Sequence, residues 1–181
     1  MGEAGETGDD RFRDPGSRLW RFAQEILVRC PRCAGRAVVV VHPDHREDQR
    51  YAVALLTAPH RLSCPGCGHT DEWSPRPMRP GDRDVYFFGG GSVAVPRLTG
   101  PDDPFFGLPL WLRRPCCGGR VLWAYNAAHL ELLERYVTAR LRERHPWTGS
   151  GSMLERLPAW MKAAGNRDEV LAAMRVLRAR A

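Results

Sequence analysis

Two short stretches of the chain carry paired cysteines, Cys30-Pro31-Arg32-Cys33 and Cys64-Pro65-Gly66-Cys67. Thiolates are the usual ligands of structural zinc, and a C-x2-C pair on a tight turn supplies two of them at once. Two such turns complete a tetrahedron with zinc–sulfur bonds of about 2.3 Å. The spacing therefore predicts one Zn²⁺ ion bound by Cys30, Cys33, Cys64 and Cys67.

A zinc ion enclosed by four thiolates has no open position for water, so the predicted centre stabilises the fold and does not catalyse a reaction. The alternative is that the two pairs are separate buried or disulfide-bonded cysteines, and disulfides need an oxidising compartment. The 30 residues between Cys33 and Cys64 exceed the usual spacing, so we expect a long hairpin between the turns. His45 and His69 lie close to the cysteines, but four thiolates make a histidine ligand unnecessary.

The two cysteine pairs differ at the residue that follows the second cysteine. Gly68 follows Cys67, whereas Ala34 follows Cys33 and the glycine is delayed to Gly35. Glycine adopts positive φ angles without steric cost, and the tight turn around a metal favours them. We therefore expect the first turn to be the looser of the two.

The remaining cysteines, Cys116 and Cys117, suggest a different chemistry. One of them could act as a nucleophile with His129 as base and Asn126 as the residue that orients it, since a thiolate near a helix N-terminus has a lowered pKa. Closeness in sequence does not define a catalytic pair, so we rank this Cys-dependent enzyme below a non-catalytic protein. A vicinal disulfide, or half of a second metal site, is a further alternative.

The segment 17–75 is predicted to form the zinc-ribbon domain, a small antiparallel sheet built around the metal. Apolar residues at helical spacing from Ser17 to Leu27 predict a short helix, although 26–28 could also be a strand. The β-branched run after the first turn predicts a strand. The expected strands are 36–42, 51–62 and 71–74, with a polar loop over 43–50.

The segment 82–181 is predicted to form a separate α+β subdomain after a proline-rich linker at 75–81. Its glycine-rich turn predicts a β-hairpin, and two further strands should flank the Cys116-Cys117 turn. The expected helices are one capped by Asn126 that continues through Leu141, one after the Ser152/Glu155 capping box with an interruption at Pro158, and one after the Asn166/Glu169 capping box. The fold class predicted for the whole chain is α+β, with a C-terminal helical part.

Charge is distributed unevenly along a chain whose formal net charge is +6. Residues 1–14 carry about −3 and residues 111–181 about +7. The acidic segment 1–16 has little to bury and is expected to be disordered. No apolar run reaches the ~18–20 residues of a membrane span, and the N-terminus lacks a secretory pattern, so we expect a cytoplasmic protein without a membrane partner.

The basic C-terminal half suggests an interaction surface that mixes aromatic and arginine side chains. Such surfaces bind nucleic acid, and they also form hot spots for protein partners. Nucleic acid is the first choice and a protein adaptor of the transcription or replication machinery is the second. The residues expected on this surface are Trp111, Arg113, Arg114, Arg120, Arg140, Arg142 and Arg144.

Both cysteine pairs read C-P-x-C, and several strings follow them: FFGLPLWL, CCGG, LWAYNAAHLELLERYV, LRER, LPAWM and NRDEVL. Together they resemble the uncharacterised bacterial CpXC family of zinc-ribbon proteins, over most of residues 18–181. Members of such families are described as transcription-factor-like or primosomal-helicase-like because of the ribbon. The chain has no Walker-type G-x4-GK[ST] motif, so the resemblance implies a zinc ribbon and no catalytic residues.

Overall fold

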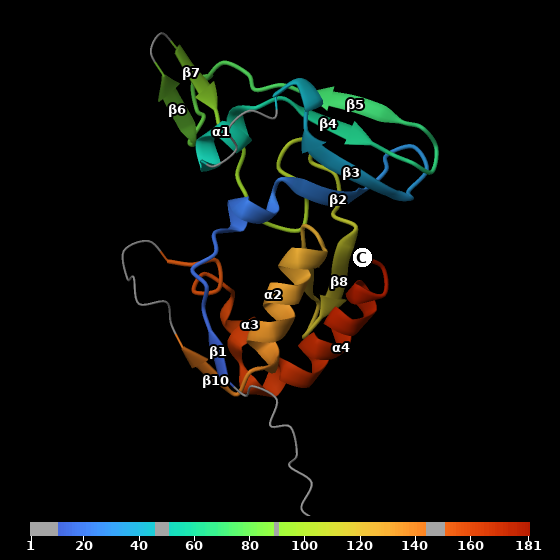
Figure 1. Ribbon diagram of the computed structural model, residues 1–181, viewed down its shortest axis with the longest axis vertical. Helices are drawn as coiled ribbons and strands as arrows, with labels where there is room; N and C mark the ends of the chain where they lie inside the picture. The colour runs from blue at the N-terminus through green and yellow to red at the C-terminus, as the bar shows by residue number, and fades with distance from the viewer. Residues whose placement is uncertain (1–10, 46–50, 89–90, 144–150) are drawn as a thin grey trace, which may run out of the picture.

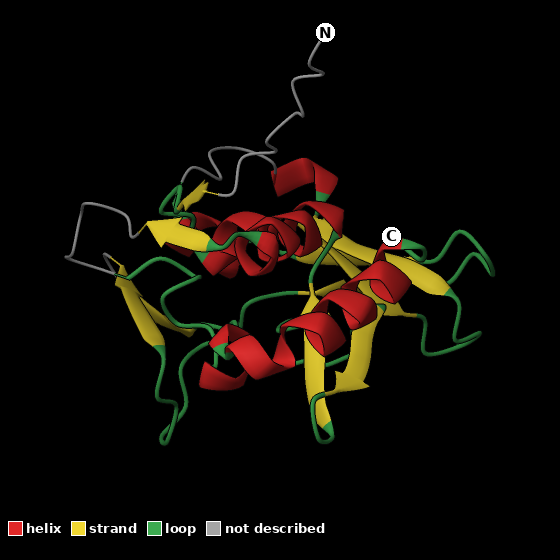
Figure 2. Cartoon of the chain, turned by 90° about the horizontal axis from the view of Figure 1, so that it is seen from below, coloured by secondary structure: helices red, strands yellow, loops and turns green. Residues whose placement is uncertain are grey.

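The computed structural model of the protein describes residues 11–45, 51–88, 91–143 and 151–181. The expected mixture of helices and strands is confirmed. Figure 1 shows a sheet across the upper part of the molecule, with helices α2 (Ala127–Thr138) and α4 (Arg167–Arg178) packed side by side below it. From below, the helices occupy the centre of the molecule and the strands surround them (Figure 2). Within the described residues, no helix combines the length and apolar character needed to cross a bilayer.

Four antiparallel strands form the upper sheet, which carries both cysteine turns and is called the cysteine sheet below. The β-branched run of the central strand favours this conformation, and alternate residues Ala37, Val39 and Val41 are buried on one face. Val38 pairs with Leu27 on one side and with Ser63 on the other. In spatial order the strands are β2 (Glu25–Arg29), β3 (Arg36–Val41), β4 (His60–Ser63) and β5 (Thr70–Trp73).

The strand predicted over 51–62 is wrong in its first half. Residues Ala52–Thr57 form helix α1, and only His60–Ser63 are extended. The apolar run here is rich in alanine and leucine, which favour helix, and one helical turn buries both Leu55 and Leu56. A short apolar run does not distinguish the two conformations by periodicity, so packing decides.

The helix predicted from Ser17 to Leu27 is also shortened. Only Leu19–Phe22 are helical, in a single 3₁₀ turn, and the chain is extended again from Glu25. The alternative strand at 26–28 is therefore the observed structure. Pairing with β3 supplies the backbone hydrogen bonds of this segment and also buries Ile26 and Val28 under the sheet.

Residues 11–16, which were predicted to belong to a disordered tail, have a defined structure. Arg11–Arg13 form strand β1, which pairs in parallel with β10 (Leu141–Glu143). Phe12, the middle residue of β1, is 5% exposed. Residues 1–10 lie outside the described part of the chain. Burial of Phe12 thus holds the N-terminal segment against the C-terminal half.

Helix α2 begins where predicted and ends earlier than predicted. The Asn126 side chain accepts a hydrogen bond from the His129 N–H at 2.9 Å, which caps the helix. The helix stops at Thr138, because β10 instead pairs with β1. Arg140 and Arg142 therefore lie beyond the helix, and Arg144 lies outside the described residues.

The two C-terminal hairpins agree with the prediction, whereas the helix caps agree only in part. Asn166 does not cap α4, because its side chain donates to the Trp160 carbonyl. Ser152 Oγ does accept the Glu155 N–H at 3.2 Å, yet the next helix starts only after Pro158. The elements are β6 (Val85–Phe88), β7 (Gly91–Ala94), β8 (Leu112–Cys116), β9 (Arg120–Ala124) and α3 (Ala159–Lys162).

Two clusters of buried side chains stabilise the molecule. One lies under the cysteine sheet, and the other, called the helical core below, joins α2, α4, β8 and β9. The edge of β2 meets the C-terminal half directly: the Leu27 N–H donates to the Tyr125 carbonyl at 2.8 Å and the Trp111 N–H to the Leu27 carbonyl at 2.9 Å. Tyr125 itself is buried in the cluster under the cysteine sheet. The two parts therefore share a hydrogen-bonded seam along β2.

Candidate metal centre

The four paired cysteines converge at one end of the cysteine sheet. Their sulfur atoms all lie within 4.8 Å of one another, and each turn faces the other across the site. Cys30 Sγ lies 3.7 Å from Cys67 Sγ, and Cys33 Sγ lies 3.6 Å from Cys64 Sγ. Zinc–sulfur bonds of about 2.3 Å in a regular tetrahedron separate the sulfurs by about 3.8 Å. The spacing thus fits a tetrahedral metal ion, and it is far longer than the ~2.05 Å of a disulfide.

The two cysteine turns have the same backbone hydrogen bonds. In the first, the Cys30 N–H donates to the Gly35 carbonyl at 2.8 Å and the Ala34 N–H donates to the Cys30 carbonyl at 2.9 Å. In the second, the Cys64 N–H donates to the His69 carbonyl at 2.8 Å and the Gly68 N–H to the Cys64 carbonyl at 2.9 Å. The first cysteine of each turn is buried and the second is exposed. The site is therefore built from two equivalent halves.

The residue after the second cysteine has a positive φ in both turns. Gly68 has φ 70° and Ala34 has φ 58°. An alanine in this left-handed region costs about 1–2 kcal/mol relative to an ordinary backbone conformation. The first turn thus reaches the same geometry as the second with local strain that the glycine avoids.

The two thiols of the first turn differ in their electrostatics. The Gly35 N–H favours the Cys33 thiolate, but the Cys67 and Cys64 thiols outweigh it and raise the pKa of Cys33 to about 12, whereas the pKa of Cys30 is lowered. Burial opposes ionisation of the Cys30 thiol, but backbone N–H groups of Cys33 and Arg32 donate to its sulfur and lower its pKa to about 6. The N–H dipoles stabilise negative charge on sulfur. Gly35 also contributes through its size, since an added Cβ would lie 3.3 Å from Cys33 Sγ.

The strands of the cysteine sheet hold the two turns against each other. β2 and β3 form the hairpin with the first turn at its tip, and β4 and β5 form the hairpin with the second. Pairing between β3 and β4 brings the tips together at the same end of the sheet. The 30 residues between Cys33 and Cys64 are accommodated because β3 runs away from the cysteine cluster, α1 follows, and β4 returns to it. His45 and His69 are not part of the metal-ligand cluster that the described residues form.

The residues predicted for the C-terminal interaction surface do not form one continuous surface. Trp111 is half-buried, and its indole N–H donates to the Arg180 carbonyl at 3.0 Å. Arg113 forms an ion pair with Asp102 at 2.9 Å. In Figure 1, β10 and β8, which carry different members of the set, lie on opposite sides of α2.

The basic members of the predicted surface differ in their surroundings. Arg114 and Arg120 are exposed on the β8–β9 hairpin. Arg140 is exposed next to β10. Arg142 stacks on Tyr136, with its guanidinium carbon 4.6 Å from the ring centroid, and donates to the Val137 carbonyl. Arg142, which was expected on the interaction surface, is thus half-buried and held by a packed contact.

The residues of the Cys-dependent alternative make other contacts in the structure. Burial raises the pKa of the Cys116 thiol to about 12, which opposes a thiolate. His129 accepts the Tyr125 N–H on Nδ1 at 3.2 Å, and Asn126 donates to the carbonyls of Phe22 and Glu25. These contacts fix both side chains for a structural purpose.

Sequence reasoning missed a cluster of arginines around the first cysteine turn. Arg29 and Arg36 are direct cross-strand partners in β2 and β3, and Arg32 lies in the turn between them. All three are exposed, and no acidic side chain of the described residues forms an ion pair with them. The C-x2-C spacing and the flanking basic residues were visible in the sequence, but the strand register that aligns them was not.

Comparison with protein-family models, with curated proteins and with solved structures finds no match to this chain. The resemblance to CpXC-type zinc-ribbon proteins therefore stays a prediction. The class of site that the structure defines is a cluster of four cysteines placed to hold a metal ion within a mixed α and β fold.

Proposed function

We propose that this protein is a non-catalytic zinc-ribbon module in which Zn²⁺ is structural and the ribbon binds nucleic acid. The observation that carries the proposal is the closed set of four sulfurs at tetrahedral separations. All four coordination positions are filled by protein, so a bound ion would have no position for water or substrate. A metal in this site stabilises the fold and leaves recognition to the surrounding side chains. A CpXC-type relationship agrees with this proposal.

Zinc is the proposed metal because four thiolates in a tetrahedron suit zinc or an iron–sulfur centre, and a site for one ion favours zinc. The six cysteines of the chain are unpaired thiols, as a reducing compartment such as the cytoplasm keeps them. Elemental analysis of the purified protein should give one zinc per chain. Iron with visible absorbance would contradict the metal assignment without affecting the site.

The arginines of the first cysteine turn support nucleic acid as the partner. Directly opposed side chains on paired strands lie about 4.5–5.5 Å apart at Cβ, so Arg29 and Arg36 place two positive charges next to each other. Such a pair is unfavourable alone and becomes favourable next to a phosphate backbone. Arg32 adds a third exposed guanidinium at the tip.

A structural explanation competes with this proposal. A zinc ion with four thiolates carries a net negative charge, and nearby arginines would offset it. In that case the three arginines raise zinc affinity and have no partner. The two explanations differ in what the arginines change: nucleic-acid affinity in the first and metal retention in the second.

The test replaces Arg29, Arg32 and Arg36 together with Gln. Binding of a short single-stranded DNA is measured between 50 and 200 mM salt (roughly the range where counterion release dominates), together with zinc content. We expect the slope of log affinity against log salt to flatten by about two to three units, with zinc retained.

A matched variant replaces Arg114, Arg120 and Arg175 with Gln, since these arginines are exposed in the C-terminal half. This variant also removes three positive charges, but from the C-terminal half, where the sequence predicted the interaction surface. A larger effect of this variant would move the interface to the C-terminal half. Loss of zinc from the ribbon variant, with the binding slope unchanged, would support the charge-offset explanation.

A protein partner is the second candidate, and it is favoured by the β6–β7 hairpin. Phe87 is 71% exposed, Tyr86 is 42% exposed and Met78 on the neighbouring segment is 41% exposed. Exposed aromatic groups of this kind form hot spots in protein interfaces. If a protein is the partner, Phe87→Ser should abolish its capture while leaving DNA binding and zinc content unchanged.

A further inference from the structure

A cavity of about 530 Å³ lies between five parts of the chain: the start of the 3₁₀ turn at Leu19–Phe22, the segment 98–100, strand β9, helix α2 and the segment 151–161. This volume is within the range of small-molecule sites. Its floor consists of buried side chains from α2 and the 151–161 segment. These floor residues are His129, Leu133, Met153 and Met161.

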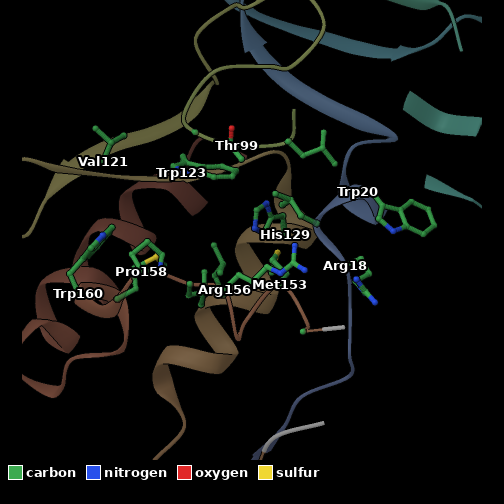
Figure 3. A pocket seen from close by; sticks show the side chains of 17 residues that line it. Arg18, Trp20, Thr99, Val121, Trp123, His129, Met153, Arg156, Pro158 and Trp160 are labelled. Carbon is green, nitrogen blue, oxygen red and sulfur yellow. The ribbon is translucent and has the colours of Figure 1, made fainter. Parts of the chain in front are cut away.

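The walls and the rim of the cavity differ from its floor. Three half-buried tryptophans form the walls: Trp20, Trp123 and Trp160. Exposed Thr99 and Arg156 belong to the rim. Figure 3 shows His129 between Trp123 above and Arg156 and Met153 below. An apolar body would therefore contact aromatic and methionine side chains, and polar groups would meet it at two places.

His129 provides a hydrogen-bond donor at the floor. The side chain is 2% exposed, and its ring stacks on Phe22 with centroids 5.0 Å apart. Nδ1 accepts the Tyr125 N–H, so the proton of the neutral ring is on Nε2. Burial lowers the pKa of His129 to about 3, which keeps the ring neutral and this tautomer in place.

The Nε2–H of His129 has no acceptor among the described residues. The fully buried polar atoms that lack a partner are found elsewhere, for example Nε2 of His60 and the hydroxyl of Tyr125. His129 lines the cavity, so a ligand bound there could reach this edge of the ring. A buried donor without an acceptor is costly, so this position favours a ligand or water that supplies an oxygen.

The charges of the lining select the kind of ligand. Arg18 and Arg156 are the charged groups among the lining residues, and no lining residue is acidic within the described part of the chain. The Nε2–H of His129 at the floor and the exposed guanidinium of Arg156 at the rim are both hydrogen-bond donors. A ligand with a negatively charged acceptor would match both groups, whereas a cationic or purely apolar ligand would match neither.

We propose that this cavity binds a small aromatic organic acid, whose ring lies against the tryptophans and whose carboxylate accepts hydrogen bonds from Arg156 and the Nε2–H of His129. Aromatic stacking and sulfur–aromatic contacts with Met153 and Met161 hold the ring. The cavity is separate from the cysteine cluster, and neither its four cysteines nor the three arginines of the proposed nucleic-acid interface line it.

The experiment uses the full chain with its metal and three probes that share one ring system: 2-naphthoate, 2-naphthamide and 2-naphthylmethylamine. Calorimetric titration should show saturable binding of the acid, weaker binding of the amide and no binding of the amine. In protein containing ¹⁵N-labelled histidine, the Nε2 resonance of His129 should shift on addition of the acid. These results depend on the charge and the acceptor, not only on the ring.

Two variants at the rim locate the binding. Arg156→Gln should lower the affinity for 2-naphthoate by about tenfold, because it removes a charge-assisted hydrogen bond. Arg175→Gln, at an exposed position of α4, should leave that affinity unchanged. Thr99→Phe should block the cavity from an exposed position, with Thr138→Phe as its control. Equal binding of acid and amine, absence of binding by the acid, or full binding to Thr99→Phe would each overturn the proposal.

Discussion

The two cysteine turns have the same backbone and different side chains. Each turn places one buried and one exposed thiol, and each closes with hydrogen bonds of 2.8 and 2.9 Å. The first turn carries Ala34 and three nearby arginines, and the second carries Gly68 and is followed by Asp71 and Glu72. The convergence of four sulfurs thus goes with one path of the chain in both turns, while the residue type at the positive-φ position and the charge around it differ.

The largest expected effect comes from removing one ligand from either turn. Cys33→Ser and Cys64→Ser should both lose zinc and unfold the cysteine sheet, because structural zinc contributes on the order of 10 kcal/mol of binding free energy. Metal analysis and loss of near-ultraviolet circular dichroism measure this. Cys116→Ser, outside the cluster, should retain the metal. Zinc loss from only one of the two ligand variants would break the equivalence of the turns.

Chelation of the metal should affect the two cores unequally. The helical core contains none of the four ligands, so amide protons of α2 and α4 should stay protected while those of β3 and β4 exchange rapidly. Limited proteolysis should then leave a fragment that begins near the 75–81 linker. Hydrogen exchange with mass spectrometry follows both regions. Complete digestion would show that the seam along β2 makes the two parts one cooperative unit.

Exchanging the residues at the positive-φ position should change stability in opposite directions. Gly68→Ala should destabilise the protein by about 1 kcal/mol, since an added Cβ meets nothing within 4 Å and only the backbone is strained. Ala34→Gly should stabilise it by about 0.5–1 kcal/mol, because relief of strain exceeds the entropy cost of glycine. Chemical unfolding of the zinc-bound protein measures both.

Gly66→Ala is the matched control for this exchange. It lies in the same turn, lacks a positive φ, and an added Cβ would have an ordinary contact 3.9 Å from Cys64 Sγ. Its stability should stay close to that of the unsubstituted protein. If Gly66→Ala destabilised as much as Gly68→Ala, crowding and not backbone conformation would be responsible.

The smallest effect concerns the charge that follows the second turn. Replacing Asp71 and Glu72 with Asn and Gln should raise DNA affinity by less than about threefold at physiological salt, since β5 lies about 14 Å from β2 and exposed charges at that distance are screened. The three-arginine variant should change affinity far more. A larger effect of the acidic pair would place the interface across the whole end of the sheet.

Short-range chemistry made part of this structure predictable from the sequence. The C-x2-C spacing identified the four residues that converge, because each pair is local and only one mutual arrangement satisfies a tetrahedron. Asn126 was recognisable as a cap because the side chain and the N–H it accepts are three residues apart. The valine run of β3 is extended whatever surrounds it.

Predictions failed where a distant partner decided the conformation. Glu25–Arg29 is a strand because β3 pairs with it, and α2 ends at Thr138 because Leu141–Glu143 pairs with β1, which is more than a hundred residues away. In both cases hydrogen bonds or burial supplied by another part of the chain outweighed a local preference of a few tenths of a kcal/mol. Asn166 is different: it matches a capping box, yet its side-chain amide donates to the Trp160 carbonyl only six residues away, so a competing local contact decided.

The sequence by itself determined which atoms could hold a metal, and the tertiary structure determined what surrounds them. Ala34 was expected to loosen its turn, and the structure shows it held in the conformation of a glycine by the hydrogen bonds of the hairpin. The opposition of Arg29 and Arg36 depends on a strand register. The cavity around His129 depends on five segments that meet only in the folded chain. The residues that can bind a metal are recognisable from short sequence motifs, whereas surfaces and cavities arise from contacts between residues far apart in the sequence.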